Sequence, residues 1–286
     1  MTETVAFIGL GNMGGPMSAR LVDAGYDVRG YDPAPAARQA FDRAGGTPAS
    51  SLADAVENAS VIVLMLPNSD VVEATVTAGY FARGSIVVDM SSSEPLRTRS
   101  LAASLALDGV TLVDAPVSGG VTRARSGELT IMTGGDEADL DRVAPLLAHL
   151  GTTTRAGTVG SGHAVKALNN LLSATHLLVT SEAILAGERF GLDPATMLSI
   201  FNRSSGKSGS TENKWPNFIL PETYASGFGL RLMLKDMRIA VGLADQVGAP
   251  DPLGHAAADL WAKAAEELDA GADHTEIVNW LRKESR

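Results

Sequence analysis

The stretch Val5–Gly14, VAFIGLGNMG, decides the fold of the first half of the chain. It opens with the apolar run Val5–Ile8 and continues with a G-x-G-x-x-G pattern made by Gly9, Gly11 and Gly14. A short apolar run that ends in such a turn and leads into a helix is typical of a strand–turn–helix unit. We therefore expect an α/β fold to begin here.

Further short apolar runs follow at regular intervals. The predicted strands are Val5–Ile8, Asp27–Tyr31, Val61–Leu66, Ile86–Asp89, Thr111–Val113 and Leu129–Met132. Most of these runs are continuous rather than alternating in polarity, as expected for a parallel sheet covered on both faces. Between them we expect helices at Met17–Ala24, at Leu52–Asn58 after the N-cap Ser51, and from Asp136, with Asp139 in its first turn. This order predicts a Rossmann-type, doubly wound parallel sheet.

The strand signals end after Gly162. A helix of roughly 25 residues, ended by Gly191, is predicted first, and the pair Asp193-Pro194 supplies an N-cap and a first-turn proline for the next. A loop at 202–213 then precedes predicted helices at Leu232–Val247, Pro252–Leu268 and Thr275–Lys283. We predict a dinucleotide-binding domain at 1–161 and an all-helical domain at 162–286 for substrate binding and dimerisation.

Composition narrows the class of protein. The 286 residues carry a formal net charge of -10, which argues against nucleic acid and anionic membranes as partners. Without cysteine the chain has no disulfides and no thiol catalysis, and we expect no metal site and a cytoplasmic location. No signal peptide pattern is visible. The apolar stretch near 164–186 is interrupted by Lys166, His176 and Glu182, so it does not predict a membrane span.

The glycine-rich turn predicts a dinucleotide site formed by Gly9, Leu10, Gly11, Asn12 and Met13. The free N–H groups at the start of the following helix would face a pyrophosphate. An ordinary glycine-rich turn is the alternative interpretation.

Asp32 ends the second predicted strand, about 20 residues further on, where a carboxylate accepts hydrogen bonds from a ribose diol. The same carboxylate would repel a 2′-phosphate, and the next arginine is Arg38, so NAD is favoured over NADP. The alternative is that Asp32 only forms an Asp-Pro turn.

Two later strand ends complete the predicted cofactor site. Leu66 and Pro67 close the third strand at its carboxyl end, where ligands of open α/β sheets bind, although a proline also simply ends strands. Ser92 lies at the corresponding end of the next strand. Its neighbour Ser93 is expected to cap the helix that starts near Glu94.

Lys166 and Asn170 are four residues apart, so they share one face of a helix, whereas Asn169 points about 100° away. A lysine inside an otherwise apolar helix is unusual, because a buried ammonium is costly without a partner. A lysine that extends to solvent from the helix start is the alternative.

A second candidate lies in the loop Asp114–Gly120, where Ser118, Gly119 and Gly120 offer hydroxyl and N–H donors for a carboxylate. An ordinary loop is equally compatible with this segment. The pair Lys235-Asp236 would, by itself, be interpreted as a solvated ion pair.

Taken in order, the glycine-rich turn, the Asp114–Gly120 loop, the Gly160–Asn170 segment and Lys235-Asp236 resemble the β-hydroxyacid dehydrogenase family, in its 3-hydroxyisobutyrate dehydrogenase group. The resemblance spans essentially the whole chain and implies a homodimer or homotetramer. It implies that Lys166 is the general acid/base, that Ser118, Gly119, Gly120 and Asn170 hold a small carboxylate substrate, and that Lys235 lies near the nicotinamide. Lys166 would take the hydroxyl proton as a hydride leaves the alcohol carbon.

The chain departs from some relatives that use 3-hydroxyisobutyrate. They carry a tryptophan three residues after the glycine of a Ser-Ser-Gly segment, and here Gly206 is followed at that spacing by Gly209. The exact substrate is therefore open, as is whether Trp215 fills the space. Tartronate semialdehyde reductase and a serine-type 3-hydroxy amino acid dehydrogenase are alternatives. A catalytically inactive dinucleotide-binding module is an alternative of another class, and imine reductases usually lack the lysine.

Overall fold

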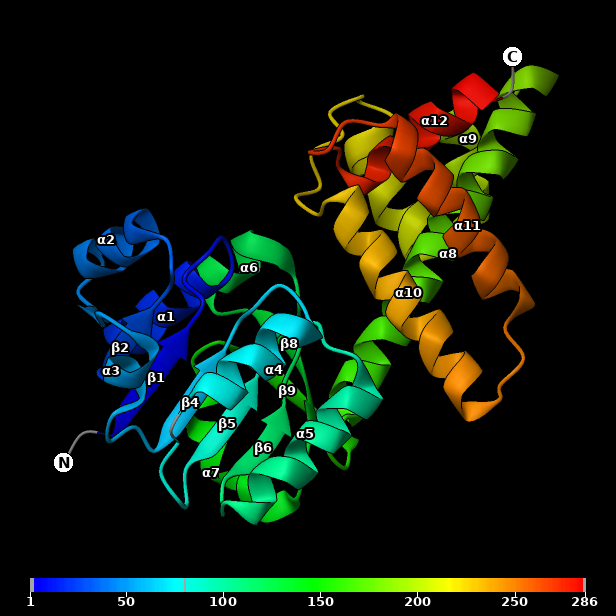
Figure 1. Cartoon of the computed structure of the whole chain (residues 1–286). Coiled ribbons are helices and arrows are strands. Elements are labelled where there is room, and N and C mark those ends of the chain that lie inside the picture. Colours follow the sequence, from blue (N-terminus) through cyan, green and yellow to red (C-terminus); the bar gives the residue numbers. More distant parts are fainter. Residues whose placement is uncertain (1–2, 80, 285–286) are drawn as a thin grey trace. The chain divides into compact units, whose positions relative to one another are not determined.

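The computed structural model describes residues 3–79 and 81–284. The chain divides into two compact units, Met1–Lys166 and Ala167–Arg286. The first is built on a β-sheet and the second is helical (Figure 1). This arrangement confirms the predicted fold class.

The sheet of the first unit has the strand order β3-β2-β1-β4-β5-β6-β8-β7, with β9 paired to β8. The strands are β1 Thr4–Ile8, β2 Asp27–Tyr31, β3 Thr47–Pro48, β4 Val61–Leu64, β5 Ile86–Asp89, β6 Thr111–Asp114, β7 Val117–Ser118, β8 Leu129–Gly134 and β9 Gly151–Gly157. Strands β1 to β6 pair in parallel, whereas β8 runs antiparallel to β6 and β7. The sheet is therefore mostly parallel, as predicted, and β8 is the strand at which it departs from parallel pairing.

Helices cover both faces of this sheet. They are α1 Gly14–Asp23, α2 Pro35–Arg43, α3 Leu52–Val56, α4 Ser69–Ala78, α5 Pro95–Leu107, α6 Gly120–Ser126 and α7 Glu137–Ala148. Val5 and Phe7 of β1 pack in one core with Met17 of α1, while Ala6 and Ile8 pack in a second core on the other face. Successive side chains of a strand point to opposite faces, so a strand covered on both faces is apolar throughout.

The strand order reverses at β1, which lies between β2 and β4. In open α/β sheets, ligands bind at such a switch point, outside the carboxyl ends of the strands. The segments that follow β1, β2, β4 and β5 all leave this same edge, because these strands are parallel. We call it the carboxyl edge of the sheet. It carries the glycine-rich turn.

The second unit is helical. Its elements are α8 Ser161–Phe190, α9 Pro194–Phe201, the π-helix η1 Ser210–Ile219, α10 Leu230–Val247, α11 Pro252–Glu267, the 3-10 helix η2 His274–Glu276 and α12 Ile277–Glu284. Helix α8 begins in the first unit and continues into the second. Trp215 is fully buried in the helical core and donates from Nε1 to Ser181 Oγ at 3.2 Å. Its indole is thus a core side chain.

Some local predictions are confirmed and others are wrong. Ser51 and Asp193 cap their helices by accepting from the backbone N–H groups of Asp54 and Thr196. Ser93 does not cap α5, because its hydroxyl donates to Asp89 at 2.9 Å. Asp136 occupies the N-cap of α7 but forms no capping hydrogen bond.

The loop predicted at 202–213 is wrong in its last part, because residues 210–213 belong to η1. The strands β3, β7 and β9 were not predicted. The first two have only two residues each, and β9 is polar and mostly exposed.

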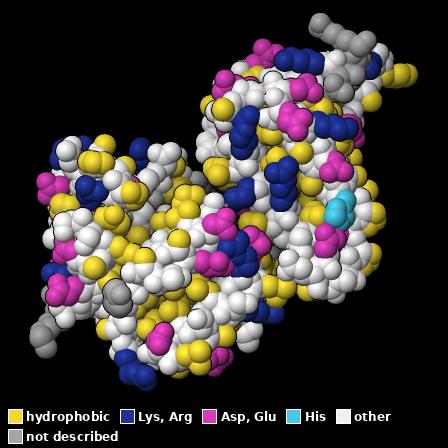
Figure 2. Space-filling model, viewed as in Figure 1, with side chains coloured by type: hydrophobic (Ala, Val, Ile, Leu, Met, Phe, Trp, Pro, Cys, Tyr) yellow, Lys and Arg dark blue, Asp and Glu magenta, His cyan; other side chains and the backbone are white. Residues whose placement is uncertain are grey.

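The face drawn in Figure 2 carries acidic and basic side chains interspersed with one another. No helix among the described residues is long and apolar enough to span a membrane. Within 3–79 and 81–284, no group of three or more His, Asp or Glu side chains is arranged to hold a metal ion.

Candidate functional site

The three glycines of the turn after β1 differ in what their environment requires. Gly9 has a φ of +95°, and a Cβ there would lie 2.3 Å from the carbonyl oxygen of Met65. A Cβ on Gly14 would lie 1.8 Å from the carbonyl oxygen of Gly9, so both positions need glycine for the fold itself. A Cβ on Gly11 would meet no protein atom within 4 Å. Packing within the protein does not explain that glycine, whereas a phosphate close to the backbone does.

The turn opens onto a groove of about 710 Å³. Leu10, Gly11 and Asn12 line it together with residues of α1, α2 and α6. Helix α1 begins at Gly14, so its N-terminal N–H groups lie at the turn and favour an anion there. The residues present therefore fit the pyrophosphate of a dinucleotide.

Asp32 connects the turn to the end of β2. Its Oδ2 accepts from the Leu10 N–H at 2.9 Å, and its Oδ1 accepts from the Ala34 N–H at 2.8 Å. Arg38 lies closer than the sequence suggested, because its Nη1 donates to the Asp32 carbonyl at 2.5 Å and to the Pro33 carbonyl at 3.2 Å. The first turn of α2 thus brings a guanidinium beside Asp32.

The ends of β4 and β5 are joined by hydrogen bonds at the carboxyl edge. The Leu66 N–H donates to Ser91 Oγ at 2.9 Å, and Asp89 accepts from the N–H of Ser91 at 3.0 Å. Pro67 is exposed and Ser92 is half-buried at this edge. Ser91, which was not among the predicted site residues, thus ties the two strand ends together.

Asp114, at the end of β6, anchors the start of α8. Its Oδ1 accepts from the Gly160 N–H at 2.6 Å, and its Oδ2 accepts from the His163 N–H at 2.8 Å. The His163 ring is buried, with Nδ1 2.9 Å from Thr98 Oγ1. Burial raises the pKa of the Asp114 carboxyl, while the charge of His163 and the backbone N–H donors oppose that rise. The aspartate therefore fixes where the helix that carries Lys166 begins.

Lys166 lies next to the Asp114–Gly120 loop. Its Nζ donates to the Val117 carbonyl at 2.9 Å, and the residue is only 8% exposed. The ammonium therefore does not extend to solvent, contrary to the alternative of a snorkelling lysine. Ser118 directly follows Val117 in β7. The structure thus brings together two motifs that are almost 50 residues apart in the chain.

The two glycines after Ser118 have positive φ angles, +129° for Gly119 and +68° for Gly120. Both angles lie in the region that favours glycine. Gly120 is the first residue of α6, so the segment is a turn that leads directly into a helix.

In the helical unit, Asn170 of α8 pairs with Asp236 of α10. Asn170 Nδ2 donates to Asp236 Oδ2 at 2.6 Å, and Asp236 is 2% exposed. Lys235 Nζ lies 3.6 Å from Asp236 Oδ1. The interpretation of Lys235-Asp236 as a solvated pair is therefore wrong for the aspartate. Asp236 fixes the orientation of the Asn170 amide, a role that its position beside Lys235 did not reveal.

Comparison with known proteins relates the chain to known families. Residues 4–183 match the family described as the NAD binding domain of 6-phosphogluconate dehydrogenase. Residues 160–281 match the family described as NAD-binding of NADP-dependent 3-hydroxyisobutyrate dehydrogenase. Among curated relatives, mitochondrial 3-hydroxyisobutyrate dehydrogenase of Homo sapiens is 38% identical, over 98% of this chain and 87% of its own length. The Pseudomonas aeruginosa 3-hydroxyisobutyrate dehydrogenase is also 38% identical, over 96% of this chain and 95% of its own.

The chain belongs to the β-hydroxyacid dehydrogenase family. The solved structure of Mycobacterium tuberculosis 3-hydroxyisobutyrate dehydrogenase with L-serine has a TM-score of 0.95 and 34% identity, covering 99% of this chain and 100% of that one. Psf3 in complex with NADP+ and 2-OPP has a TM-score of 0.83 at 26% identity, covering 97% and 99%. Membership in the family confirms the predicted hydroxyacid dehydrogenase class and a nicotinamide dinucleotide cofactor.

Proposed function

We propose that this β-hydroxyacid dehydrogenase oxidises a small 3-hydroxy acid of the 3-hydroxyisobutyrate type with NAD, and that Lys166 is its general acid/base. The observation that carries the proposal is the buried Lys166 ammonium at 2.9 Å from the Val117 carbonyl, directly before Ser118. A lysine held in this way lies beside the donors expected for a substrate carboxylate. The names of the relatives support the substrate class.

A bound nicotinamide would supply the acceptor for the hydride of the alcohol carbon. Lys166 in its neutral form takes the proton of the same hydroxyl, so the alcohol becomes an aldehyde. The backbone carbonyl of Val117 keeps the amine in place. Asp114 has a positioning role. Its carboxylate accepts hydrogen bonds from the N–H groups of Gly160 and His163 and so fixes the start of α8, the helix that carries Lys166.

Substrate binding is proposed for Ser118, Gly119, Gly120 and Asn170. Ser118 offers a hydroxyl and the positive-φ glycines offer N–H groups, which are suitable donors for a carboxylate. Asn170 Nδ2 carries two hydrogens, and Asp236 accepts one of them at 2.6 Å. The second remains for a substrate oxygen.

Cofactor binding is proposed for Gly9 to Met13, Asp32, Leu66, Pro67, Ser92 and Lys235, with a preference for NAD over NADP. The preference rests on the Asp32 carboxylate, which favours a free ribose diol and repels a 2′-phosphate. Arg38 works against it, because arginine near this position accommodates a 2′-phosphate in NADP enzymes. Its Nη1 donates to the Asp32 and Pro33 carbonyls, which supports a structural role.

The proposed domains are the dinucleotide-binding segment 1–161 and the substrate and dimerisation segment 162–286. We also propose a homodimer or homotetramer in the cytoplasm. Helix α8 carries a row of exposed apolar side chains, Val165, Leu168, Leu172 and Val179, at helical spacing. Such a stripe marks a surface that another subunit covers. Light scattering after size-exclusion chromatography tests the subunit number.

A panel of 3-hydroxy acids tests the activity. The purified protein is assayed with NAD+ and NADP+ against 3-hydroxyisobutyrate, glycerate, serine and 3-hydroxypropionate. Oxidation of 3-hydroxyisobutyrate with NAD+ supports the proposal. Preference for glycerate would instead favour a tartronate semialdehyde reductase, and preference for serine a 3-hydroxy amino acid dehydrogenase. If the protein binds the dinucleotide but oxidises none of these hydroxy acids, the result would favour a catalytically inactive dinucleotide-binding module.

A further inference from the structure

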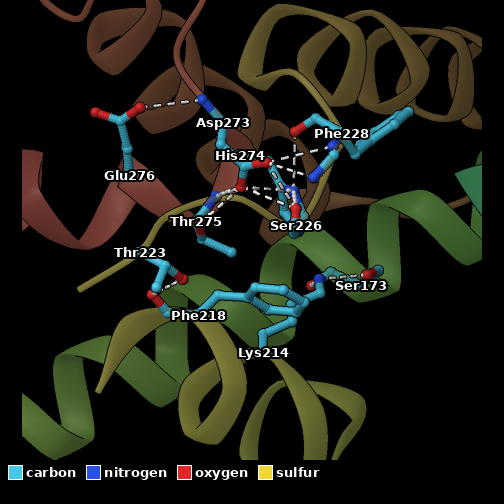
Figure 3. A network of polar contacts seen from close by, with 11 residues as sticks. Ser173, Lys214, Phe218, Thr223, Ser226, Phe228, Asp273, His274, Thr275 and Glu276 are labelled. Carbon is cyan, nitrogen blue, oxygen red and sulfur yellow. Dashed lines mark hydrogen bonds and ion pairs between the residues drawn. The ribbon is translucent and has the colours of Figure 1, made fainter. Parts of the chain in front are cut away.

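The helical unit contains a lysine that the proposed reaction does not use. Lys214 of η1 is half-buried, and its Nζ donates to Ser173 of α8, to Oγ at 2.6 Å and to the carbonyl at 3.2 Å (Figure 3). Both acceptors are uncharged. Within the part of the chain that the structure describes, Lys214 forms no ion pair with a carboxylate.

The carboxylate that acts on Lys214 over a longer range, Asp273, is already engaged elsewhere. It accepts from the hydroxyl of Ser226 and from the N–H groups of Gly227 and Thr275 (Figure 3). It also caps η2 in a capping box with Glu276. Asp273 is therefore held by its own turn, and Lys214 keeps a positive charge without a paired anion. Burial lowers the pKa of Lys214 to about 8.

Ser173 places this ammonium on a definite face of α8. Lys166, Asn170 and Ser173 follow one another at i, i+4 and i+7, so they form one row along the helix. Ser173 lies about 4.5 Å beyond Asn170 along the helix axis, at 1.5 Å per residue. Further along, the same face enters the apolar core through Leu177. Lys214 therefore lies at the end of the polar row that begins with the proposed catalytic lysine.

The π-helix adds a second observation. Residues five apart lie close together on one face of a π-helix, because the i→i+5 hydrogen bond closes one turn. Gly209, at the N-cap of η1, is five residues before Lys214. A Cβ on Gly209 would meet no protein atom within 4 Å. Gly209 therefore leaves room on the face of η1 that carries Lys214.

We propose that Lys214, tethered by Ser173, binds a second carboxylate carried on carbon 2 of the 3-hydroxy acid substrate. The substrate class is then a 3-hydroxy dicarboxylic acid. This inference rests on the proposed function, since it requires Lys166 and Asn170 to act on the same molecule. The ammonium supplies charge-assisted hydrogen bonds to the additional carboxylate.

Two matched substrates test this. 2-(Hydroxymethyl)succinate carries a –CH2–COO− arm on carbon 2, and 2-(hydroxymethyl)butanoate carries an uncharged ethyl group there, which is two non-hydrogen atoms smaller. We expect the native enzyme to favour the dicarboxylate in kcat/KM by roughly tenfold or more, as expected for a hydrogen bond to a charged group. Lys214→Met should lose that preference, mainly through KM, and leave the butanoate unchanged. Lys214→Arg should retain part of it.

Lys207→Met is the matched control, because Lys207 lies in the same segment, is exposed and pairs with Glu212 at 2.8 Å. It should not alter the preference. If Lys214→Met does not fold, Ser173→Ala removes the hydroxyl part of the tether, leaves the carbonyl part, and should reduce the preference in the same direction. Equal losses with both substrates in these variants, or no preference in the native enzyme, overturn the inference.

The outcomes for the two proposals differ. If the enzyme oxidises 3-hydroxyisobutyrate but not the dicarboxylate, the proposed role of Lys214 is refuted and the proposed function stands. Absence of oxidation with every hydroxy acid refutes the proposed function itself.

Discussion

The two units hold their polar groups in different ways. In the sheet unit, carboxylates at strand ends accept hydrogen bonds from backbone N–H groups. Asp32 accepts one from Leu10, and Asp114 accepts one from Gly160. In the helical unit, polar side chains of different helices bind one another, as Asn170 does with Asp236. The first kind of site depends on the backbone path at the end of a strand. The second depends on how helices pack.

This difference decides how each unit responds to substitution. A site made of backbone groups is sensitive to glycines and to the residues that fix the path of the chain. A site made of side chains from several helices is sensitive to charge and to pH, because its groups are buried and ionisable. Variants that change one unit and leave the other untouched test the comparison directly.

Lys166, at the junction of the two units, should give the largest effect. We expect Lys166→Ala to lower kcat/KM by about 10²–10⁴, the usual contribution of a general acid/base. NAD binding, measured by fluorescence titration, should stay within a few fold. Lys166→Arg should be equally inactive, since a guanidinium stays protonated and cannot accept the proton. A Lys166→Ala enzyme with native kcat would remove the lysine from the mechanism.

His274 should make the helical unit sensitive to acid. Burial, and next the charge of Lys214, lower the pKa of His274 to about 4. The unfolded chain, with a histidine pKa near 6.5, then binds more protons than the native one between pH 4 and 6.5. Stability should therefore fall as the pH is lowered through this window, by on the order of 3 kcal/mol.

Urea unfolding followed by tryptophan fluorescence measures this effect selectively, because Trp215, Trp261 and Trp280 all lie in the helical unit. His274→Gln should flatten the dependence between pH 4 and 6.5. His255→Gln, at an exposed histidine, is the control and should leave it unchanged. An identical pH dependence in native protein and His274→Gln would rule out this role for His274.

Gly14 and Gly11 provide a matched pair in the sheet unit. Gly14→Ala should destabilise that unit by about 1–3 kcal/mol, the typical effect of overpacking, because the new Cβ meets the Gly9 carbonyl. Gly11→Ala should change stability by no more than about 0.5 kcal/mol and weaken NAD binding instead. Circular dichroism melting and NAD titration of both variants separate the two effects. Equal destabilisation by both would contradict the assignment of Gly11 to the cofactor.

Asp32 should give the smallest effect. We expect the native enzyme to prefer NAD to NADP by at least roughly tenfold in kcat/KM, or about 1.4 kcal/mol. Asp32→Ser should reduce this preference by improving the use of NADP, with Arg38 available to the 2′-phosphate. Adding Arg38→Ala to Asp32→Ser should cancel that improvement. Equal use of both cofactors by the native enzyme would refute the preference.

Much of the fold was predictable because it depends on local patterns. Strands covered on both faces are continuous apolar runs, and the six predicted from such runs are all present. Ser51 and Asp193 were predicted as caps because a cap involves only residues three apart. Strand β9 lacked such a signal, since its residues are mostly exposed and it exists through its pairing with β8.

The sequence by itself determined the glycine turn, the position of Asp32, and the spacing of Lys166 and Asn170, because each follows from the chain's own geometry over one strand end or one helical turn. Only the tertiary structure decided what these groups contact. It placed Lys166 against the Val117 carbonyl, joined Leu66 to Ser91, and paired Asn170 with Asp236. Contacts between distant segments follow from how elements pack, and no local pattern encodes that packing.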